Sequence, residues 1–257
     1  MPKQLNVNVM RLHLLTALLC VSLPISAFAN GNTTNDSFSK AKKIMQTQVY
    51  TQPDEMFTIY CGAKFDKKKH ITLPQGFTST KYRNRQKTWE AEHVVPAENF
   101  GRSFIAWREG DPSCVSSKGK HYKGRKCANK ASHEYRLMQA DLYNLYPAIG
   151  SVNALRQNYN FTMLPSVKSD FGRCDMRIED RKVQPPVRAR GEIARTYLYF
   201  DATYPRYKMS SSQKKLMEAW NKQYPVTKIE CERSETIQRI QGNINEFVKK
   251  PCVKAKL

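Results

Sequence analysis

The chain has 257 residues, and its 43 Lys and Arg against 22 Asp and Glu give a formal net charge of +21. A basic excess of this size predicts an anionic partner, with nucleic acid ahead of a membrane surface or an acidic polysaccharide. Beyond an N-terminal apolar run, no segment approaches the roughly 20 apolar residues of a membrane-spanning helix, which argues against a membrane anchor.

The first 29 residues have the pattern of a secretory signal peptide. A cationic start precedes a mostly apolar run from Leu12 to Ile25, and Ala27-Phe28-Ala29 matches an A-x-A cleavage site. A buried N-terminal helix is the alternative interpretation of this run. We expect residues 1–29 to be removed, leaving residues 30–257 as one exported domain in the periplasm or outside the cell.

The predicted elements that follow are mostly helices. Residues 30–35 are polar and are expected to lack fixed structure, and Ser37 or Asp36 can cap the first helix. Helical spacing of apolar residues is found from Phe38 to Val49, after Ser132 with Pro147 as the stop, near Gly191 to Phe200, from Leu216 to Tyr224, and from Ile237 to Phe247. Short strands are expected at residues 58–61 and 94–95. The pattern predicts the α+β class, mostly helical with a few short strands.

Six cysteines lie beyond the expected cleavage site, and an even number in an exported chain predicts three disulfides. Zinc binding is the alternative, but no CxxC or paired Cys/His spacing supports it. Cys114 and Cys127 flank a polar loop and form the best local pair, and the spacing leaves the other pairings open. The six residues are Cys61, Cys114, Cys127, Cys174, Cys231 and Cys252.

The segment Trp89-Glu90-Ala91-Glu92-His93-Val94-Val95-Pro96-Ala97 combines residues suited to phosphodiester hydrolysis. A carboxylate that suits Mg²⁺ stands beside an imidazole that titrates near neutrality. Neighbours in a regular strand point to opposite faces, so Glu92 and His93 can meet at one phosphate only at a strand end or a bend. Pro96 gives a reason for such a bend. The alternatives are a core histidine without chemical function and a surface ion pair of Glu92.

A basic segment from Lys118 to Lys130 contains no acidic residue. Such a run is usually a solvated face, but Lys123 and Lys126 are candidates for contacts with nucleic-acid phosphates. Arg125 lies two residues before Cys127, so a disulfide there would restrict its position. A fixed guanidinium can bind a phosphate through two hydrogen bonds.

Taken in order, these motifs resemble the periplasmic and secreted endonuclease I family of bacteria. The similarity extends from about Ala41 to Cys252. It is carried by Glu92-His93-Val94-Val95-Pro96-Ala97, Phe100-Gly101, Arg136-Leu137-Met138-Gln139-Ala140-Asp141-Leu142, Asn144-Leu145, Pro147-Ala148-Ile149-Gly150-Ser151-Val152-Asn153 and Arg190-Gly191-Glu192-Ile193-Ala194-Arg195-Thr196-Tyr197. The resemblance implies a ββα-metal nuclease core, in which short antiparallel strands and a helix present a histidine and one Mg²⁺ to the scissile phosphate.

The resemblance also implies a role for each matching residue. His93 is expected to be the general base that activates water, and Arg125 to stabilise charge on the phosphate. Glu92 and Asn153 are expected to bind the Mg²⁺, although the sequence does not distinguish this ion from Mn²⁺ or Ca²⁺.

The chain departs from the family pattern at two places. Gln139 stands where the family usually has a glutamate, and we expect it, with Asn144, to support the site without touching the metal. A further cysteine pair of some relatives is absent, because Ala63 follows Gly62, which again implies three disulfides.

The sequence therefore predicts a monomeric, sequence-non-specific endonuclease that hydrolyses DNA, with RNA as a second expected substrate. The first alternative is a non-catalytic, basic nucleic-acid-binding protein of the same fold. The second is a cationic membrane-active protein, which the absence of a strongly amphipathic basic helix in the sequence disfavours.

Overall fold

The computed structural model describes Met1 and residues 31–257, so the predicted signal peptide lies, apart from Met1, outside the described residues. The α-helices are α1 (Phe38–Ile44), α2 (Ala97–Gly101), α3 (Ile105–Arg108), α4 (Arg125–Ala131), α5 (His133–Gln139), α6 (Gly150–Arg156), α7 (Arg190–Thr203), α8 (Ser211–Gln223), α9 (Lys228–Gln241) and α10 (Glu246–Ala255). The strands are β1 (Lys64–Phe65), β2 (Ile71–Thr72), β3 (Trp89–His93), β4 (Leu145–Ile149), β5 (Asn160–Phe161), β6 (Arg177–Glu179) and β7 (Lys182–Gln184). Shorter helical turns are η1 (Met45–Val49), η2 (Arg83–Arg85), η3 (Leu142–Asn144) and η4 (Val187–Ala189). This mixture confirms the predicted α+β class.

Within residues 31–257 the strands form three small sheets. β3 and β4 are antiparallel, with Trp89 opposite Ile149 and His93 opposite Leu145. β1 with β2 and β6 with β7 are also antiparallel, whereas β5 pairs with β7 in parallel over two residues. α6 follows β4 directly and packs against both β3 and β4. The β3–β4–α6 unit thus has the ββα order that the family resemblance implies.

Serine side chains begin several helices, as predicted. The hydroxyl of Ser37 accepts a hydrogen bond from the amide of Lys40 at 3.2 Å and caps α1. Ser132 caps α5 in the same way through Tyr135. Each cap satisfies an amide that has no partner inside the helix, which fixes where the helix begins.

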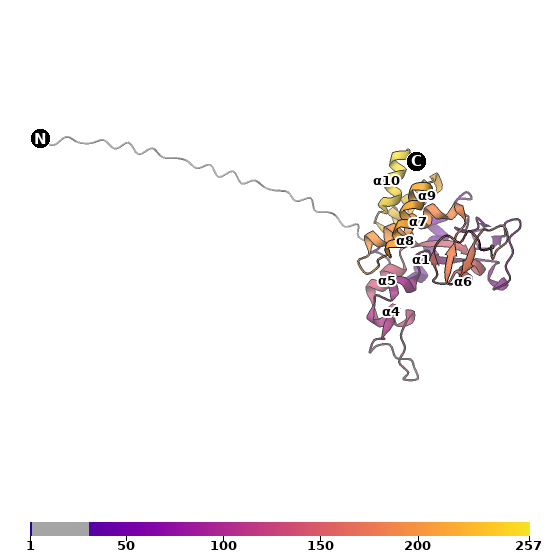
Figure 1. Ribbon diagram of the computed structural model, residues 1–257. Helices are drawn as coiled ribbons and strands as arrows, with labels where there is room; N and C mark the ends of the chain where they lie inside the picture. Colours follow the sequence, from indigo (N-terminus) through magenta and orange to yellow (C-terminus); the bar gives the residue numbers. More distant parts are fainter. Residues whose placement is uncertain (2–30) are drawn as a thin grey trace.

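The long helices gather around α7, which is buried along most of its length and packs against α8 and α10. Figure 1 shows α7 to α10 on one side of the molecule and α4 and α5 below them. The loop before α4 extends away from the rest of the structure (Figure 1). This loop, residues 109–124, joins α3 to α4, and we call it the projecting loop.

Two predicted strands are wrong. Residues 58–61 form a turn, in which the amide of Thr58 bonds to Ala63 and the amide of Ile59 to Pro147. Residues 94–95 form a bend immediately after β3 instead of a strand. β-branched residues mark both sites, but side-chain preference does not show which neighbour accepts each amide hydrogen bond.

Two predicted helices have different limits. The helix capped by Ser132 ends at Gln139, because the carboxylate of Asp141 accepts a hydrogen bond from Tyr143 and starts the separate turn η3. The predicted run from Ile237 to Phe247 is divided between α9 and α10 at Gly242, whose φ of 86° ends α9. Glycine adopts this left-handed conformation at low cost, so it ends helices well.

The N-terminal residues 31–35 are held in place, contrary to the prediction for this segment. Asn32 is buried, and its side-chain amide donates to the carbonyl oxygens of Asn35 and Leu137 at 2.6 and 2.8 Å. Its backbone amide donates to the hydroxyl of Tyr204 at 2.9 Å. Polar side chains that are buried and hydrogen-bonded can order a segment without apolar residues.

The six predicted disulfide cysteines form three pairs, Cys61–Cys174, Cys114–Cys127 and Cys231–Cys252. The predicted local pair Cys114–Cys127 is confirmed, and it closes the base of the projecting loop. Cys61–Cys174 joins residues 113 positions apart, so sequence spacing gave no reason to pair them.

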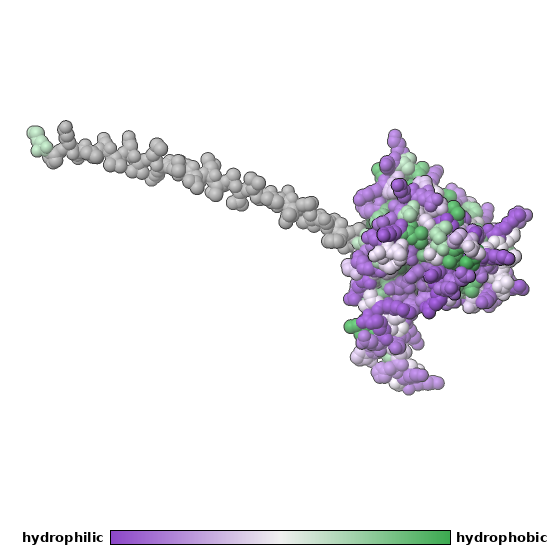
Figure 2. Space-filling model, in the orientation of Figure 1, coloured by the Kyte–Doolittle hydropathy of each residue, from purple (hydrophilic) through white to green (hydrophobic). Residues whose placement is uncertain are grey.

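Hydrophilic residues cover most of the face seen in Figure 2, including the projecting loop. In the described part of the chain, no helix has both the length and the apolar character needed to cross a bilayer.

Candidate active site

A cavity of about 320 Å³ lies at the end of the β3–β4 pair, and we call it the central cavity. Its lining includes Glu92 and His93 from β3, Arg125 from α4 and Asn153 from α6. The structure thus brings together the four residues for which the family resemblance implies catalytic and metal-binding roles. Phe38, Trp107 and Arg156 are among the other lining residues.

Close packing of α6 against β3 depends on a glycine. A Cβ atom added at Gly150 would lie 2.3 Å from the carbonyl oxygen of Arg85 and 2.7 Å from the carboxylate of Glu90. The missing side chain therefore allows the first turn of α6 to approach β3. This approach carries Asn153, one turn later, to the central cavity.

His93 is the last residue of β3 and is buried. Its Nε2 lies 2.8 Å from the backbone oxygen of Gln139. A carbonyl oxygen only accepts hydrogen bonds, so Nε2 carries the proton and Nδ1 of the neutral ring is unprotonated. Nδ1 makes no hydrogen bond to any described residue, which leaves it free to accept a proton from a bound water molecule.

The environment of His93 favours the neutral ring. Burial, with the positive charges of Arg125 and Arg156, lowers the pKa of His93 to about 3, although the carbonyl of Gln139 opposes this shift. The neutral form is the one that can act as a base. An anion bound between His93 and Arg125 would offset the guanidinium charge and raise the pKa of His93 towards neutrality.

Glu92 is buried, so the predicted alternative of a surface ion pair is wrong. Its Oε1 accepts hydrogen bonds from the hydroxyl of Tyr60 at 2.7 Å and from Nη1 of Arg156 at 2.9 Å. Burial raises the pKa of Glu92, while the charge of Arg156 and the hydrogen bond from Tyr60 lower it. Oε2 makes no hydrogen bond to any described residue and remains free on a side chain that lines the central cavity.

The side-chain amide of Asn153 is oriented by Glu90. Nδ2 of Asn153 donates to Oε2 of Glu90 at 2.8 Å, and Arg85 holds the same carboxylate through two hydrogen bonds of 2.8 and 2.6 Å. This arrangement leaves Oδ1 of Asn153 without a hydrogen bond to the described residues. The oxygen, and not the nitrogen, is therefore the atom available to a cation.

The bend after β3 explains how sequence neighbours reach one cavity. Asn144 bonds to the backbone of Val95 twice, as acceptor at 2.7 Å and as donor at 2.9 Å. Arg156 donates to the backbone oxygens of His93 and Val94 at 2.8 and 2.7 Å. Pro96 follows Val95 and is the residue that precedes α2. The bend is thus held by Asn144 and Arg156 from other elements, more than by Pro96.

The predicted basic residues lie around the central cavity at different positions. Arg125 is the first residue of α4, and its guanidinium lies 5.3 Å from the ring centre of Phe38. Lys126 lines a neighbouring pocket and lies over the ring of Tyr122 at 5.1 Å. Lys123 lines a third pocket on the projecting loop. Of these three cations, only Arg125 lines the central cavity.

Gln139 supports the site through its backbone, as the acceptor for His93. Its side chain faces the neighbouring pocket and donates to the side chain of Asn129. Asn144 supports the bend described above. Neither residue lines the central cavity, and each contacts residues that do or that adjoin them.

The oxygen atoms available in the central cavity suit a hard cation. Oε2 of Glu92 and Oδ1 of Asn153 are both free, and Mg²⁺ prefers oxygen ligands while keeping several waters. No group of three or more His, Cys, Asp or Glu placed to hold a metal is found in the part of the chain that the structure describes. A site with few protein ligands agrees better with Mg²⁺ than with a closed structural zinc site.

Sequence reasoning missed three residues that position the site: Tyr60, Glu90 and Arg156. Two of them left a signal. Glu90 lies two residues before Glu92 on the same face of β3, and Arg156 lies three residues after Asn153 on the same side of α6. Tyr60 left none, because it reaches Glu92 from a turn far away in the sequence.

Comparison with known proteins gives a consistent set of similarities. Residues 29–252 match the family described as Endonuclease I. An extracellular deoxyribonuclease of Aeromonas hydrophila is 37% identical over 241 residues, covering 91% of this chain and 96% of that protein. A periplasmic deoxyribonuclease of Aeromonas hydrophila is 40% identical over 202 residues, covering 76% and 79%. Endonuclease-1 of Buchnera aphidicola subsp. Acyrthosiphon pisum is 36% identical over 228 residues, covering 86% and 84%.

Proposed function

The chain belongs to the endonuclease I family, and from this premise we propose that it is an exported endonuclease that hydrolyses phosphodiester bonds of DNA and also of RNA. The observation that carries the proposal is the convergence of Glu92, His93, Arg125 and Asn153 on the central cavity. The names of its relatives support a place in the periplasm or outside the cell, reached through the signal peptide predicted in residues 1–29.

His93 is the proposed general base. Nδ1 accepts a proton from the attacking water, while the carbonyl of Gln139 keeps the ring in place and stabilises the imidazolium that forms. Phe38 and Phe100 pack against the ring, with centroids 4.8 and 6.4 Å away, and limit its movement. Positioned base catalysis contributes roughly 10²–10⁴-fold to the rate.

The other residues act on the charge of the phosphate. Arg125 binds a non-bridging oxygen and stabilises the charge that develops in the transition state. Oε2 of Glu92 and Oδ1 of Asn153 would hold one Mg²⁺, with Mn²⁺ or Ca²⁺ as alternatives. The bound ion would supply Lewis-acid stabilisation of the phosphate and of the leaving oxygen. Arg156 and Tyr60 keep the free oxygen of Glu92 directed to the cavity through their hydrogen bonds to Oε1.

The cations outside the central cavity support binding without sequence preference. Lys126 of α4, Lys123 and the other basic residues of the projecting loop offer phosphate contacts, which position a nucleic acid but do not read its bases. Such binding weakens steeply with added salt. We propose that the protein works on DNA and RNA as a monomer.

Removal of divalent cations tests this function directly. Purified protein is expected to degrade supercoiled plasmid and RNA in Mg²⁺, to lose this activity in excess EDTA, and to regain it when Mg²⁺ or Mn²⁺ is restored. Glu92→Gln serves as the matched variant, because it keeps the shape of the side chain and removes the charge. DNA binding by gel shift without any cleavage under all of these conditions would favour the non-catalytic alternative instead.

Acid inactivation should reveal the state of His93. The base must be neutral, and its pKa is lowered from 6.5 to about 3, so kcat/KM should be retained below pH 6.5 and lost only as the pH falls towards the lowered value. A bound phosphate raises this pKa, and kcat reports the complex whereas kcat/KM reports the free enzyme. The acid limb of kcat is therefore expected at higher pH than that of kcat/KM.

Initial rates on a fluorescent oligonucleotide, measured across pH with circular dichroism at each point, check this order. The dichroism separates loss of activity from loss of fold. If the acid limbs of kcat and of kcat/KM coincided at or above pH 6.5, the assignment of His93 as a buried neutral base would be contradicted.

A further inference from the structure

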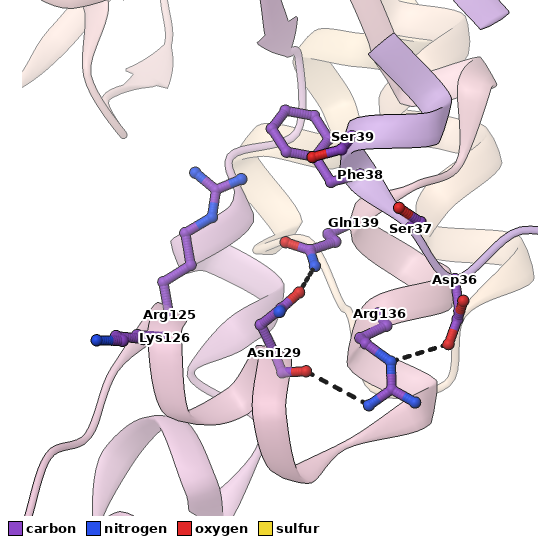
Figure 3. Close-up of a pocket in the computed structure, with 9 residues that line it drawn as sticks. All are labelled: Asp36, Ser37, Phe38, Ser39, Arg125, Lys126, Asn129, Arg136 and Gln139. Carbon is purple, nitrogen blue, oxygen red and sulfur yellow. Dashed lines mark hydrogen bonds and ion pairs between the residues drawn. The ribbon is translucent and has the colours of Figure 1, made fainter. Parts of the chain in front are cut away.

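A second cavity, of about 580 Å³, adjoins the central cavity, and on the basis of the proposed nuclease function we propose that it binds the nucleotide next to the scissile phosphate. We call it the flanking pocket (Figure 3). Its lining includes Asp36, Phe38, Arg125, Lys126, Arg136 and Gln139. Phe38 and Arg125 line both cavities, so a nucleic-acid strand with one phosphate at His93 continues directly into the flanking pocket.

The charge of the flanking pocket suits a phosphodiester. Its lining holds three cationic side chains and a single acidic one, Asp36. Arg136 binds this carboxylate at 2.9 Å, and the hydrogen bond lowers the pKa of Asp36. Arg125 and Lys126 form no ion pair with any residue that the structure describes, so their charges are available to an anion. With its one carboxylate already paired, the pocket suits an anion better than a metal ion.

Two side-chain amides form the floor of the flanking pocket, and each keeps one polar atom without a partner within residues 31–257. The side chain of Gln139 is buried beneath the pocket, and its nitrogen donates to Oδ1 of Asn129. Figure 3 shows the two amides facing each other between the side chains of Arg125 and Arg136. Oε1 of Gln139 and Nδ2 of Asn129 make no hydrogen bond to the described residues. One acceptor and one donor therefore remain for the sugar, base or phosphate of a nucleotide.

Phe38 lies between the two cavities and offers the nucleic-acid strand an apolar surface to cross. The ring is half-buried and lies 4.8 Å from the ring of His93 and 5.3 Å from the guanidinium of Arg125. Aromatic side chains next to cations are the usual support of single-stranded nucleic acid, because every base or sugar can pack on them. The nearest nucleotide is thus held by Phe38 on one side and by the amide floor on the other.

Binding of a labelled single-stranded tetranucleotide tests the flanking pocket. Fluorescence anisotropy in Mg²⁺ with His93→Ala protein measures affinity without cleavage. Adding Gln139→Glu, which places a carboxylate in the floor, is expected to weaken binding about tenfold, because the new negative charge repels the phosphates of the bound strand. Adding Lys126→Gln should weaken it less and reduce the slope of log K against log salt by about 0.7, the value for one phosphate contact on a single strand.

Two exposed residues of α8, outside both cavities, provide matched controls. Gln223→Glu and Lys222→Gln make the same changes of charge and should leave affinity within about twofold, since screened charges far from a ligand contribute little. Lys126 lies on the exposed surface of α4, so its substitution should not disturb the fold. Lys126→Gln therefore still tests nucleotide binding in the flanking pocket if thermal unfolding shows that Gln139→Glu damages the fold.

Equal affinities of the pocket variants and their controls for the tetranucleotide would overturn the proposal that the flanking pocket binds a nucleotide. Cleavage of plasmid by the wild-type protein in the same preparation would keep the proposed function intact in that case. Failure of the wild-type protein to cleave, together with no tetranucleotide binding by the His93→Ala parent, would instead remove the nuclease function on which the pocket rests.

Discussion

Replacing His93 with alanine is expected to lower the rate of DNA cleavage by roughly 10²–10⁴-fold, the contribution of a positioned general base. The backbone oxygen of Gln139 fixes the proton on Nε2, so the variant loses the only unprotonated ring nitrogen presented to the central cavity by the described residues. Glu92, Asn153 and Arg125 remain. Binding of Mg²⁺ and of DNA should therefore persist while turnover fails, with the loss seen in kcat more than in KM.

The measurement combines single-turnover cleavage with DNA binding and thermal unfolding. His70→Ala is the matched control, because His70 is exposed, pairs with Asp66 and lies outside the central cavity. Added imidazole should restore part of the activity of His93→Ala, since the lost ring leaves space beside Phe38. A purely structural role for His93 would show no such rescue, and undiminished cleavage by His93→Ala would remove the assignment of the base.

Local sequence signals were enough to predict parts of this molecule. Serine caps set the start of α1 and α5, and the short spacing of Cys114 and Cys127 indicated their disulfide. Adjacent residues of a strand diverge, so the pair Glu92–His93 required a strand end, and β3 ends at His93. Each of these inferences depends on residues close together in the chain.

Other features depend on contacts between distant segments, for which one sequence carries little signal. Arg156 holds the bend after β3 only because α6 packs against that strand. Residues 58–61 form a turn because Ile59 bonds to Pro147 and Thr58 to Ala63. The buried Asn32 is ordered by Leu137 and Tyr204. Tertiary partners overrode local preference at each position.

The buried pair of Arg156 and Glu92 should be the main structural support of the site. Arg156 has no exposed side-chain surface, and its guanidinium bonds to Oε1 of Glu92 and to the backbone oxygens of His93 and Val94. Removing one partner of a buried pair leaves the other charge without compensation and costs about 3–5 kcal/mol. Arg156→Met is therefore expected to lower the melting temperature by on the order of 10 °C in a domain of this size.

Arg195→Met provides the control for this substitution. Arg195 forms a buried pair with Glu230 at 2.6 Å, and neither residue lines the central cavity. Both variants should be destabilised to a similar degree, because both leave a buried carboxylate without its cation. Only Arg156→Met should also lose cleavage at temperatures where the fold is intact, since only Arg156 holds Glu92 and the backbone of His93.

A divalent cation should distinguish the two variants further. Without Arg156, the carboxylate of Glu92 keeps only the hydrogen bond from Tyr60, so a cation bound at Glu92 replaces the missing positive charge. Ligands that bind only the folded state raise stability in proportion to the logarithm of their concentration. Mg²⁺ should therefore raise the melting temperature of Arg156→Met more than that of Arg195→Met. Equal responses of the two variants to Mg²⁺ would show that the cation binds elsewhere. An Arg156→Met protein as stable as wild type in EDTA would show that Glu92 does not depend on Arg156.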